Sequence, residues 1–168
     1  MYENIIVKKN AGVGTITLDR PKSLNALNKK MYRELDSALT EMESDPNVRA
    51  ILLTGSGERA FSAGADIKEA ARLASNSDTP PSDPPKIDPN WHIASCTKPT
   101  IGAINGLAYG GAAVIASALD IRVGCERTSF RFLAASYGRI NSTWSLPMQV
   151  GWPLAKELLF TARVIDAE

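Results

Sequence analysis

The most constraining feature of this 168-residue chain is a run of 21 residues without a charge, from Pro99 to Leu119. The run is long enough to cross a bilayer as a helix, and its glycines recur at the GxxxG spacing of packed membrane helices. It also contains Asn105 and four glycines, and only six of its residues are Leu, Ile or Val. We therefore predict a buried strand over 100–104, a turn, and a buried Ala-rich helix over 110–119 within a soluble domain, with no membrane partner.

Strands and helices are expected to alternate along the rest of the chain. Met31, Leu35, Leu39 and Met42 recur at helical spacing, and the continuous apolar run 50–54 predicts a strand that is covered on both faces. Further strands are predicted over 5–7, 15–18 and 120–124, and further helices over 66–74, 91–96 and 154–161. This order favours an α/β fold with right-handed crossovers, forming one domain over residues 1–168.

Composition excludes several classes of protein. The net charge is 19 − 18 = +1, which lacks the basic excess that neutralises phosphates, so no nucleic-acid partner is expected. Two cysteines are too few for a disulfide scaffold and favour a reducing, cytoplasmic setting. The first ten residues lack the apolar core of a signal peptide. Residues 75–90 hold five prolines and three aspartates, which predicts a mobile surface loop.

Two loops that contain glycine connect a predicted strand to a predicted helix. Their sequences are AFSAGADIK (60–68) and NGLAYGGA (105–112). A helix N-terminus offers unpaired N–H groups and the positive end of the helix dipole, and small residues let a ligand approach them. Two such termini that face one cavity would form an oxyanion hole, although turns and tight packing would require the same glycines. Neither loop matches a nucleotide-binding pattern.

Five segments carry a resemblance that spacing alone does not. In chain order they are LDRPKSLNAL (18–27), AFSAGADIK (60–68), KP with AINGLAYGG (98–111), DIRVGCERTSF (120–130) and RVIDA (163–167). With these segments the sequence resembles the crotonase, or enoyl-CoA hydratase/isomerase, superfamily. The resemblance implies a crotonase-like spiral of ββα turns that assembles as a homotrimer or hexamer. It also implies that the chain is the spiral core of a longer protein, with the C-terminal helical region missing.

The same resemblance implies a substrate and a site. The substrate would be an acyl-CoA thioester, with coenzyme A as part of the substrate, no permanently bound cofactor and no metal. The backbone N–H groups of Ala65 and Gly111 would hold the thioester oxygen as an enolate develops. Coenzyme A would lie along Lys22, Ser23, Leu24, Ala63, Asp66 and Ile67. Asp66 also fits a simpler role, which is to cap the helix that follows it.

The sequence departs from the family where the hydratases carry their two catalytic glutamates. Val114 and Ala134 occupy those positions, and no Asp or Glu occurs between Glu126 and Glu157. Hydration by the usual acid/base pair is therefore not expected. Ser142-Thr143-Trp144 matches the end of a segment that bears an acid in the isomerases, but Arg139 or Ile140 takes the place of that acid.

Other side chains are candidates for moving protons. His92 is the only histidine and precedes the second glycine loop, and an imidazole titrates near neutral pH. Tyr109 and Tyr137 could orient a substrate carboxylate or donate a proton, and each of the three also fits a purely structural role. Two functions stay open. One is a lyase or isomerase that stabilises a thioester enolate, and the other is a non-catalytic acyl-CoA-binding member of the fold.

Overall fold

A computed structural model describes residues 1–75 and 89–168. The strands are β1 (Ile5–Asn10), β2 (Val13–Leu18), β3 (Ala50–Gly55), β4 (Ala60–Ser62), β5 (Thr100–Ile104), β6 (Leu107–Tyr109), β7 (Ile121–Gly124) and β8 (Ser129–Arg131). The helices are α1 (Lys29–Ser44), α2 (Ile67–Ser75), α3 (Pro89–Ala94), α4 (Gly111–Ala118), α5 (Ser145–Val150) and α6 (Trp152–Thr161). Two short 3-10 turns complete the description, η1 (Pro21–Ser23) and η2 (Ala135–Tyr137).

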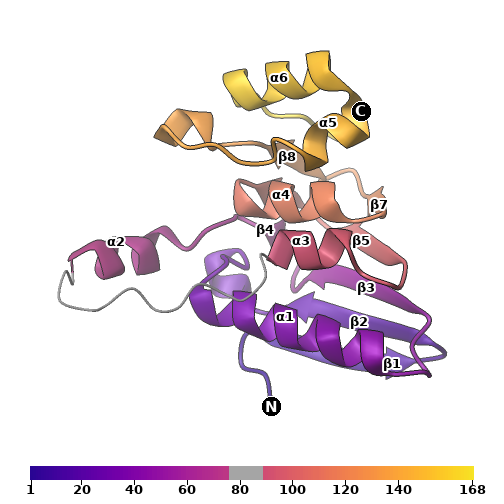
Figure 1. The fold of residues 1–168 in the computed structure, drawn as a ribbon. Helices are drawn as coiled ribbons and strands as arrows, with labels where there is room; N and C mark the ends of the chain where they lie inside the picture. The colour runs from indigo at the N-terminus through magenta and orange to yellow at the C-terminus, as the bar shows by residue number, and fades with distance from the viewer. Residues whose placement is uncertain (76–88) are drawn as a thin grey trace.

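The strands form two sheets that both extend along the length of the molecule. The larger sheet has the order β1-β2-β3-β5-β7, and all its pairs are parallel except β1 with β2. The smaller sheet, β4-β6-β8, is parallel. Each of β3, β5 and β7 is followed by a three-residue strand of the smaller sheet and then by helix, so successive ββα turns stack from α1 at one end to α6 at the other (Figure 1). The predicted spiral of ββα turns is confirmed.

Helix α1 illustrates how the local sequence sets this architecture. The side chain of Asn28 accepts a 2.7 Å hydrogen bond from Met31 N, which caps the first turn. The apolar stripe predicted from helical spacing is buried against the sheet, where Met31, Leu35 and Met42 are fully inaccessible. The helix ends before Pro46, as the sequence indicates.

The uncharged run 99–119 forms β5, β6 and α4. Helix α4 is eight residues long and buried almost throughout, because its small side chains let it pack between the two apolar clusters of the core. Within residues 1–75 and 89–168, no helix is both long enough and apolar enough to cross a membrane.

Sequence periodicity did not reveal β4, β6, β8 or α5. The three strands have three residues each, which is too short to show an alternating pattern, and parallel partners distant in the chain define them. The helix predicted over 91–96 begins earlier, at Pro89, and ends at Ala94. Of the predicted 75–90 loop, Ser75 ends α2 and Pro89 begins α3, while residues 76–88 lie outside the described residues.

Candidate functional site

The two glycine loops meet at Gly64. This residue has φ +83°, and a Cβ added to it would lie 2.3 Å from the carbonyl oxygen of Tyr109 and 2.9 Å from the nitrogen of Gly111. Both the backbone conformation and the close approach make any larger residue strained at this position. Gly110, with φ +54°, caps the N-terminus of α4 in a conformation that L side chains rarely adopt. The glycines therefore bring the start of α4 against the loop that leads into α2.

Two backbone N–H groups where these loops meet donate no hydrogen bond to any described residue. The N–H groups of Leu27 and Asp66 donate to Gly64 O (2.8 Å) and Leu27 O (3.0 Å), and this pairing skips Ala65 N. Gly111 is the first residue of α4, so its N–H has no acceptor within the helix. Among the hydrogen bonds of the described residues, Ala65 N and Gly111 N donate none.

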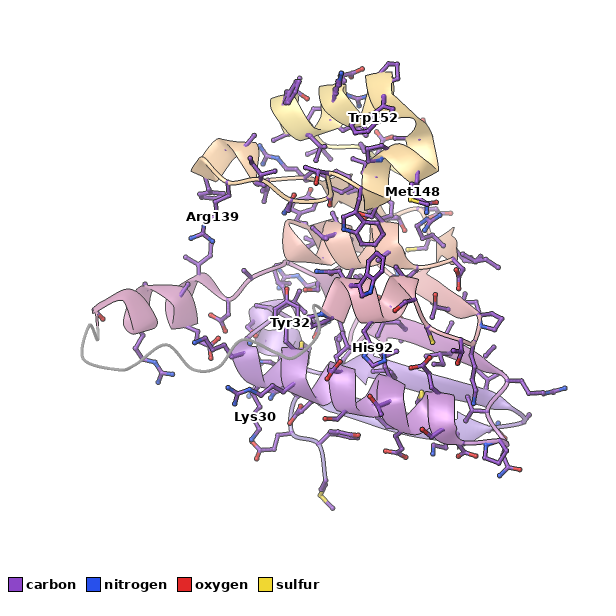
Figure 2. The ribbon with its side chains drawn as sticks, in the orientation of Figure 1. Lys30, Tyr32, His92, Arg139, Met148 and Trp152 are labelled. Carbon is purple, nitrogen blue, oxygen red and sulfur yellow. The ribbon has the colours of Figure 1, made fainter. Side chains whose placement is uncertain are left out.

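The two N–H groups border the same small space. A Cβ on Gly111 would lie 3.8 Å from Ala65 N, and the hydroxyl oxygen of Tyr32 would lie 2.9 Å from that same point. Figure 2 shows Tyr32 at the N-terminal end of α1, below α4. Sequence reasoning missed Tyr32, because only the packing of α1 against α4 brings this phenol to the glycine loops.

An open cavity of about 740 Å³ lies beside Ala65, and Gly111 is not among its lining residues. Its lining includes Ala65 and all six residues predicted to border coenzyme A, which are Lys22, Ser23, Leu24, Ala63, Asp66 and Ile67. The lining also includes Arg20, Lys68 and Arg72, which the sequence analysis did not name. Lys68 and Arg72 are four residues apart on α2 and so lie on one face of the helix, a signal that was present in the sequence.

Asp66 holds the entry to α2 in place. One of its carboxylate oxygens accepts the N–H of Glu69 at 3.1 Å, and the other pairs with Arg20 Nη1 at 2.9 Å. The hydrogen bond from Glu69 N–H lowers the pKa of the Asp66 carboxyl, and Arg20 lowers it further against the opposing effect of burial. The predicted capping role of Asp66 is therefore observed, and its ion pair fixes Arg20 at the cavity wall.

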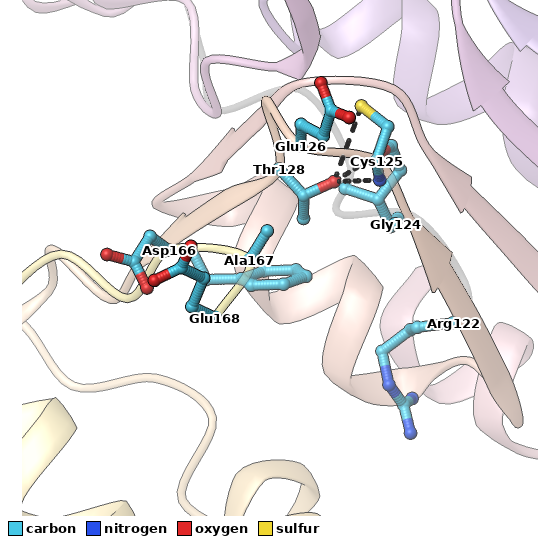
Figure 3. A pocket seen from close by; sticks show the side chains of 10 residues that line it. Arg122, Gly124, Cys125, Glu126, Thr128, Asp166, Ala167 and Glu168 are labelled. Carbon is cyan, nitrogen blue, oxygen red and sulfur yellow. Dashed lines mark hydrogen bonds between the residues drawn. The ribbon is translucent and has the colours of Figure 1, made fainter.

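A second hollow lies near the end of the chain and shares no lining residue with the glycine loops. It measures about 880 Å³ and lies between the β7–β8 turn and residues 166–168 (Figure 3). Within it, the Thr128 hydroxyl accepts the N–H of Cys125 at 2.7 Å and donates to the carbonyl of Ile104 at 2.7 Å. These bonds stabilise the turn and do not involve the N–H groups of Ala65 and Gly111.

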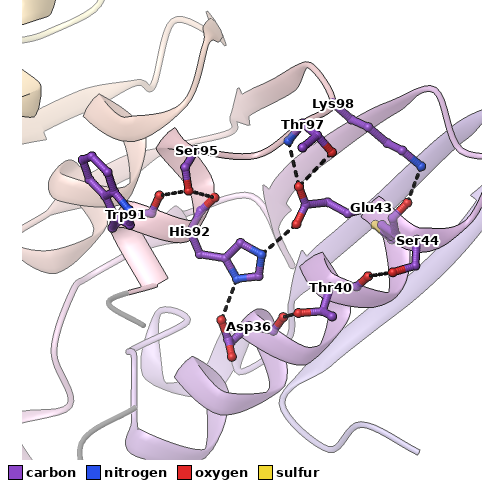
Figure 4. Close-up of polar contacts among 10 residues, drawn as sticks. Asp36, Thr40, Glu43, Ser44, Trp91, His92, Ser95, Thr97 and Lys98 are labelled. Atoms are coloured by element: carbon purple, nitrogen blue, oxygen red, sulfur yellow. Dashed lines mark hydrogen bonds and ion pairs between the residues drawn. The ribbon is translucent and has the colours of Figure 1, made fainter. Parts of the chain in front are cut away.

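The structure places His92 against α1 instead of at the glycine loops. Its Nδ1 lies 2.6 Å from Asp36 Oδ1 and its Nε2 lies 2.9 Å from Glu43 Oε2 (Figure 4). With a carboxylate on each ring nitrogen and the ring buried, the imidazole has no nitrogen available for a substrate. This geometry argues against the predicted catalytic role and makes His92 a cross-link between α1 and α3.

The contacts between His92, Asp36 and Glu43 favour the protonated form of the imidazole and the ionised form of the carboxylates. Burial lowers the pKa of His92, but the hydrogen bonds and negative charges of Asp36 and Glu43 outweigh this effect and raise the pKa overall. Burial raises the pKa of Glu43, but hydrogen bonds from Thr97 N–H, His92 and the Thr97 hydroxyl bring the pKa down to about 2. Protonated imidazole and ionised carboxylate therefore stabilise each other.

The remaining candidates occupy separate places. Tyr137 lies on η2 with 64% of its surface exposed, and it stays a prediction. The hydroxyl of Tyr109 accepts a 3.4 Å hydrogen bond from the Ser129 hydroxyl. Val114 is buried in α4, and Ala134 precedes η2, so both positions where the resemblance predicts glutamates carry apolar side chains.

Comparison with known proteins agrees with this fold. The sequence model of the enoyl-CoA hydratase/isomerase family matches residues 8–168. The chain is 37% identical over 171 residues to the short-chain-enoyl-CoA hydratase of Clostridium acetobutylicum, covering 98% of this chain and 64% of that protein. It is 41% identical over 174 residues to the mitochondrial enoyl-CoA hydratase of Pongo abelii, covering 99% of this chain and 58% of that protein. The chain belongs to the enoyl-CoA hydratase/isomerase family.

Solved structures of the family share the fold. An enoyl-CoA hydratase of Mycobacterium marinum superposes with a TM-score of 0.89 at 32% identity, covering 98% of this chain and 78% of that chain. An enoyl-CoA hydratase of Bacillus anthracis superposes with a TM-score of 0.85 at 31% identity, covering 98% of this chain and 65% of that chain. The chain thus spans 64% and 58% of the length of the two curated relatives named above, which is less than two thirds of each.

Proposed function

We propose that this chain binds an acyl-CoA thioester and stabilises its enolate with the backbone N–H groups of Ala65 and Gly111. The observation that carries the proposal is that the N–H groups of Ala65 and Gly111 lie near each other, that neither donates to a described residue, and that Ala65 lines a cavity with several basic side chains. Family membership adds support, because the curated relatives are named enoyl-CoA hydratases.

The proposed chemistry follows from where charge develops. Removing a proton or a carboxylate from the carbon next to a thioester places negative charge on the thioester oxygen. Two fixed N–H donors stabilise this charge more than they stabilise the neutral carbonyl, and they need no reorganisation during the reaction. The N-terminus of α4 adds the positive end of its helix dipole at Gly111.

The basic wall of the cavity fits the other end of such a ligand. Lys22, Lys68 and Arg72 supply positive charges, and the Arg20–Asp66 pair fixes a fourth basic group. Coenzyme A carries several phosphate charges, and basic side chains are the usual partners of phosphate. We place the nucleotide part of coenzyme A along this wall and the thioester at Ala65 and Gly111.

The side chains at positions 114 and 134 limit which reactions the chain could catalyse. Because Val114 and Ala134 cannot exchange protons, we propose double-bond isomerisation, decarboxylation or an atypical hydration in place of hydration by a glutamate pair. The absence of both acids is also the observation that favours a second function, in which the chain binds acyl-CoA without turning it over.

Turnover separates these two functions. The chain is incubated with crotonyl-CoA, a 3-enoyl-CoA and methylmalonyl-CoA, and products are followed by chromatography. Conversion of any of them supports the enzyme, and Gly111→Pro, which removes one donor, should then lower the rate by about 100- to 1000-fold. Proline is tolerated at the first position of a helix, so α4 should persist in this variant. Measurable binding with no product from any thioester would support the non-catalytic function.

Binding tests the proposed nucleotide wall independently of catalysis. Arg72→Glu reverses a charge at the cavity, whereas Arg33→Glu makes the same change on an exposed part of α1 outside the lining. Calorimetric titration with coenzyme A should show weaker, less salt-sensitive binding for Arg72→Glu and unchanged binding for Arg33→Glu. Equal effects of the two variants would contradict this placement.

A further inference from the structure

A small apolar pocket lies between α4, α5 and α6, which are neighbours at the C-terminal end of the molecule (Figure 1). It measures about 200 Å³, and none of its described lining residues belongs to the basic cavity at the glycine loops. Most of the lining is apolar and includes Phe132, Leu146 and Leu158. Such a pocket takes up the apolar part of a ligand, and its few polar groups fix the orientation of that ligand.

Arg122 is the charged residue in the described lining of this pocket. The two other polar lining residues, Ser117 and Gln149, already have partners. The Ser117 hydroxyl donates to the carbonyl of Val114 at 2.8 Å, and Gln149 Oε1 accepts a 2.6 Å hydrogen bond from Arg122 Nη2. The guanidinium is therefore the group that would meet the polar end of a ligand.

The guanidinium is held at the end of α4. Its Nη1 donates to the carbonyls of Ala116 at 3.1 Å and Leu119 at 2.5 Å, where the negative end of the helix dipole favours a cation. A guanidinium has five N–H groups, and within residues 1–75 and 89–168 one N–H on Nε and one on Nη2 donate to no partner. Nε and Nη2 belong to one planar fork, which is the arrangement that pairs with the two oxygens of a carboxylate.

The positive charge of Arg122 has no ion-pair partner in the part of the chain that the structure describes. Asp120 lies two residues earlier, but its carboxylate accepts the N–H and the hydroxyl of Thr100, both at 2.8 Å. Figure 3 shows the guanidinium pointing away from the acidic side chains of the larger hollow. Burial lowers the pKa of Arg122 and outweighs the opposing effect of Asp120. A partly desolvated cation beside apolar surface favours an anionic partner.

The volume of the pocket limits the length of an alkyl chain inside it. A water molecule takes up about 30 Å³ in the liquid, and a methylene group is of similar size. The pocket of about 200 Å³ therefore holds a chain of about six to eight carbons.

We propose that this pocket is a second ligand site, which binds a medium-chain fatty acid with its carboxylate on Arg122 and its alkyl chain between α4, α5 and α6. The guanidinium supplies the two N–H groups and the charge for the carboxylate, and the apolar lining supplies the surface for the chain. The site is independent of the proposed acyl-CoA site, because the described linings of the two have no residue in common.

Calorimetric titration with hexanoate, octanoate and decanoate tests the site in the unaltered chain. Each added methylene up to about eight carbons should tighten binding by about fourfold, and decanoate should gain little more. Octan-1-ol has the same chain length as octanoate but no charge, and it should bind at least about tenfold more weakly. The inference is overturned if octanoate shows no saturable binding. It is also overturned if octan-1-ol binds equally well, because Arg122 would then have no role.

One pair of variants tests the charge. Arg122→Gln removes the guanidinium and should weaken octanoate binding by about tenfold or more. Arg127→Gln removes a positive charge from the neighbouring β7–β8 turn, outside the lining, and should leave binding unchanged. Equal effects of the two variants would contradict the pairing of the carboxylate with Arg122.

A second pair of variants tests the pocket without removing the contacts of Arg122 to α4. Val150 lines the pocket and is 38% exposed, so Val150→Trp obstructs the pocket from a position that tolerates a larger side chain. Val13 is 39% exposed and lies outside the lining, so Val13→Trp is the matched control. Octanoate should bind to the control and lose its binding in Val150→Trp. Undiminished binding in Val150→Trp would overturn the inference, even if Arg122→Gln fails to fold.

Competition separates this site from the proposed acyl-CoA site. Saturating coenzyme A should leave the affinity for octanoate unchanged. If coenzyme A displaces octanoate, the fatty acid occupies the basic cavity, and this inference is overturned while the proposed function stands. If octanoate does not bind and Val150→Trp dissociates a dimer in analytical ultracentrifugation, a second copy of the chain covers the pocket, which also overturns the inference.

Discussion

Replacing His92 with phenylalanine would remove the cross-link between α1 and α3 while keeping a planar ring of similar size. The change deletes two contacts to carboxylates, at 2.6 and 2.9 Å. Hydrogen bonds between charged groups contribute about 1.5–3 kcal/mol each, but the side chains of Asp36 and Glu43 are 35% and 20% exposed, so solvent screens part of this energy. Glu43 also keeps its bonds from Thr97, which limits the loss to about 2 kcal/mol.

This loss should depend on pH in a defined direction. The pKa of His92 is raised in the folded chain, so its stabilisation is present in full below the unfolded pKa of about 6.5 and is lost as pH rises through the folded pKa. Neutral imidazole has one N–H, so at high pH one of the two ring nitrogens would present a lone pair to a carboxylate. The pKa of Glu43 is about 2, so Glu43 stays ionised over this range.

Urea unfolding followed by tryptophan fluorescence measures the effect. At about pH 6, His92→Phe should lower the free energy of unfolding by about 2 kcal/mol, or the melting temperature by about 4–8 °C. At about pH 9 the difference from the unaltered chain should fall below about 1 kcal/mol. A difference of the same size at both pH values would refute the charged cross-link, and a difference close to zero at both would show that the contacts contribute nothing.

Three further changes test the glycine loops and the entry to α2. Gly64→Ala should destabilise the chain by at least about 2 kcal/mol in urea unfolding, because Gly64 has a positive φ and a Cβ there would overlap the carbonyl of Tyr109; a neutral effect would contradict the close contact of the loops. Gly111→Ala should cost about 1 kcal/mol, since its Cβ would lie 2.9 Å from the Tyr32 hydroxyl, and adding Tyr32→Phe should recover part of the loss. If the two changes lowered the free energy of unfolding by amounts that simply add, the Tyr32 hydroxyl would not lie beside Gly111. Asp66→Ala should cost about 1 kcal/mol at neutral pH, and the cost should disappear as pH falls through the lowered pKa of the Asp66 carboxyl; a cost that persists in acid would show that this carboxylate does not contribute.

Local patterns in the sequence predicted the main body of the fold. The helical stripe of Met31, Leu35 and Met42 predicted α1, and the uncharged run 99–119 predicted a buried strand and a buried helix. Both signals are periodic or compositional within one segment, so no distant residue is needed to recognise them. The short strands of the second sheet have no such signal, because pairing with distant strands defines them.

The candidate site, too, could be predicted from the sequence only in part. The glycine loops could be identified because turns and close backbone approach restrict which amino acids are possible there. The residues around Lys22 could be identified because they lie in a segment that resembles the family. That Gly111 faces Ala65, with the Tyr32 hydroxyl beside both, depends on packing of α1 and α4, which are far apart in the chain. Likewise, His92 has the same intrinsic chemistry in any fold, but only the tertiary structure decided that its two nitrogens meet Asp36 and Glu43 instead of a substrate. The sequence by itself determined which backbone conformations and apolar faces are possible, and the tertiary structure decided which polar groups meet, because hydrogen bonds and ion pairs act only over a few ångströms.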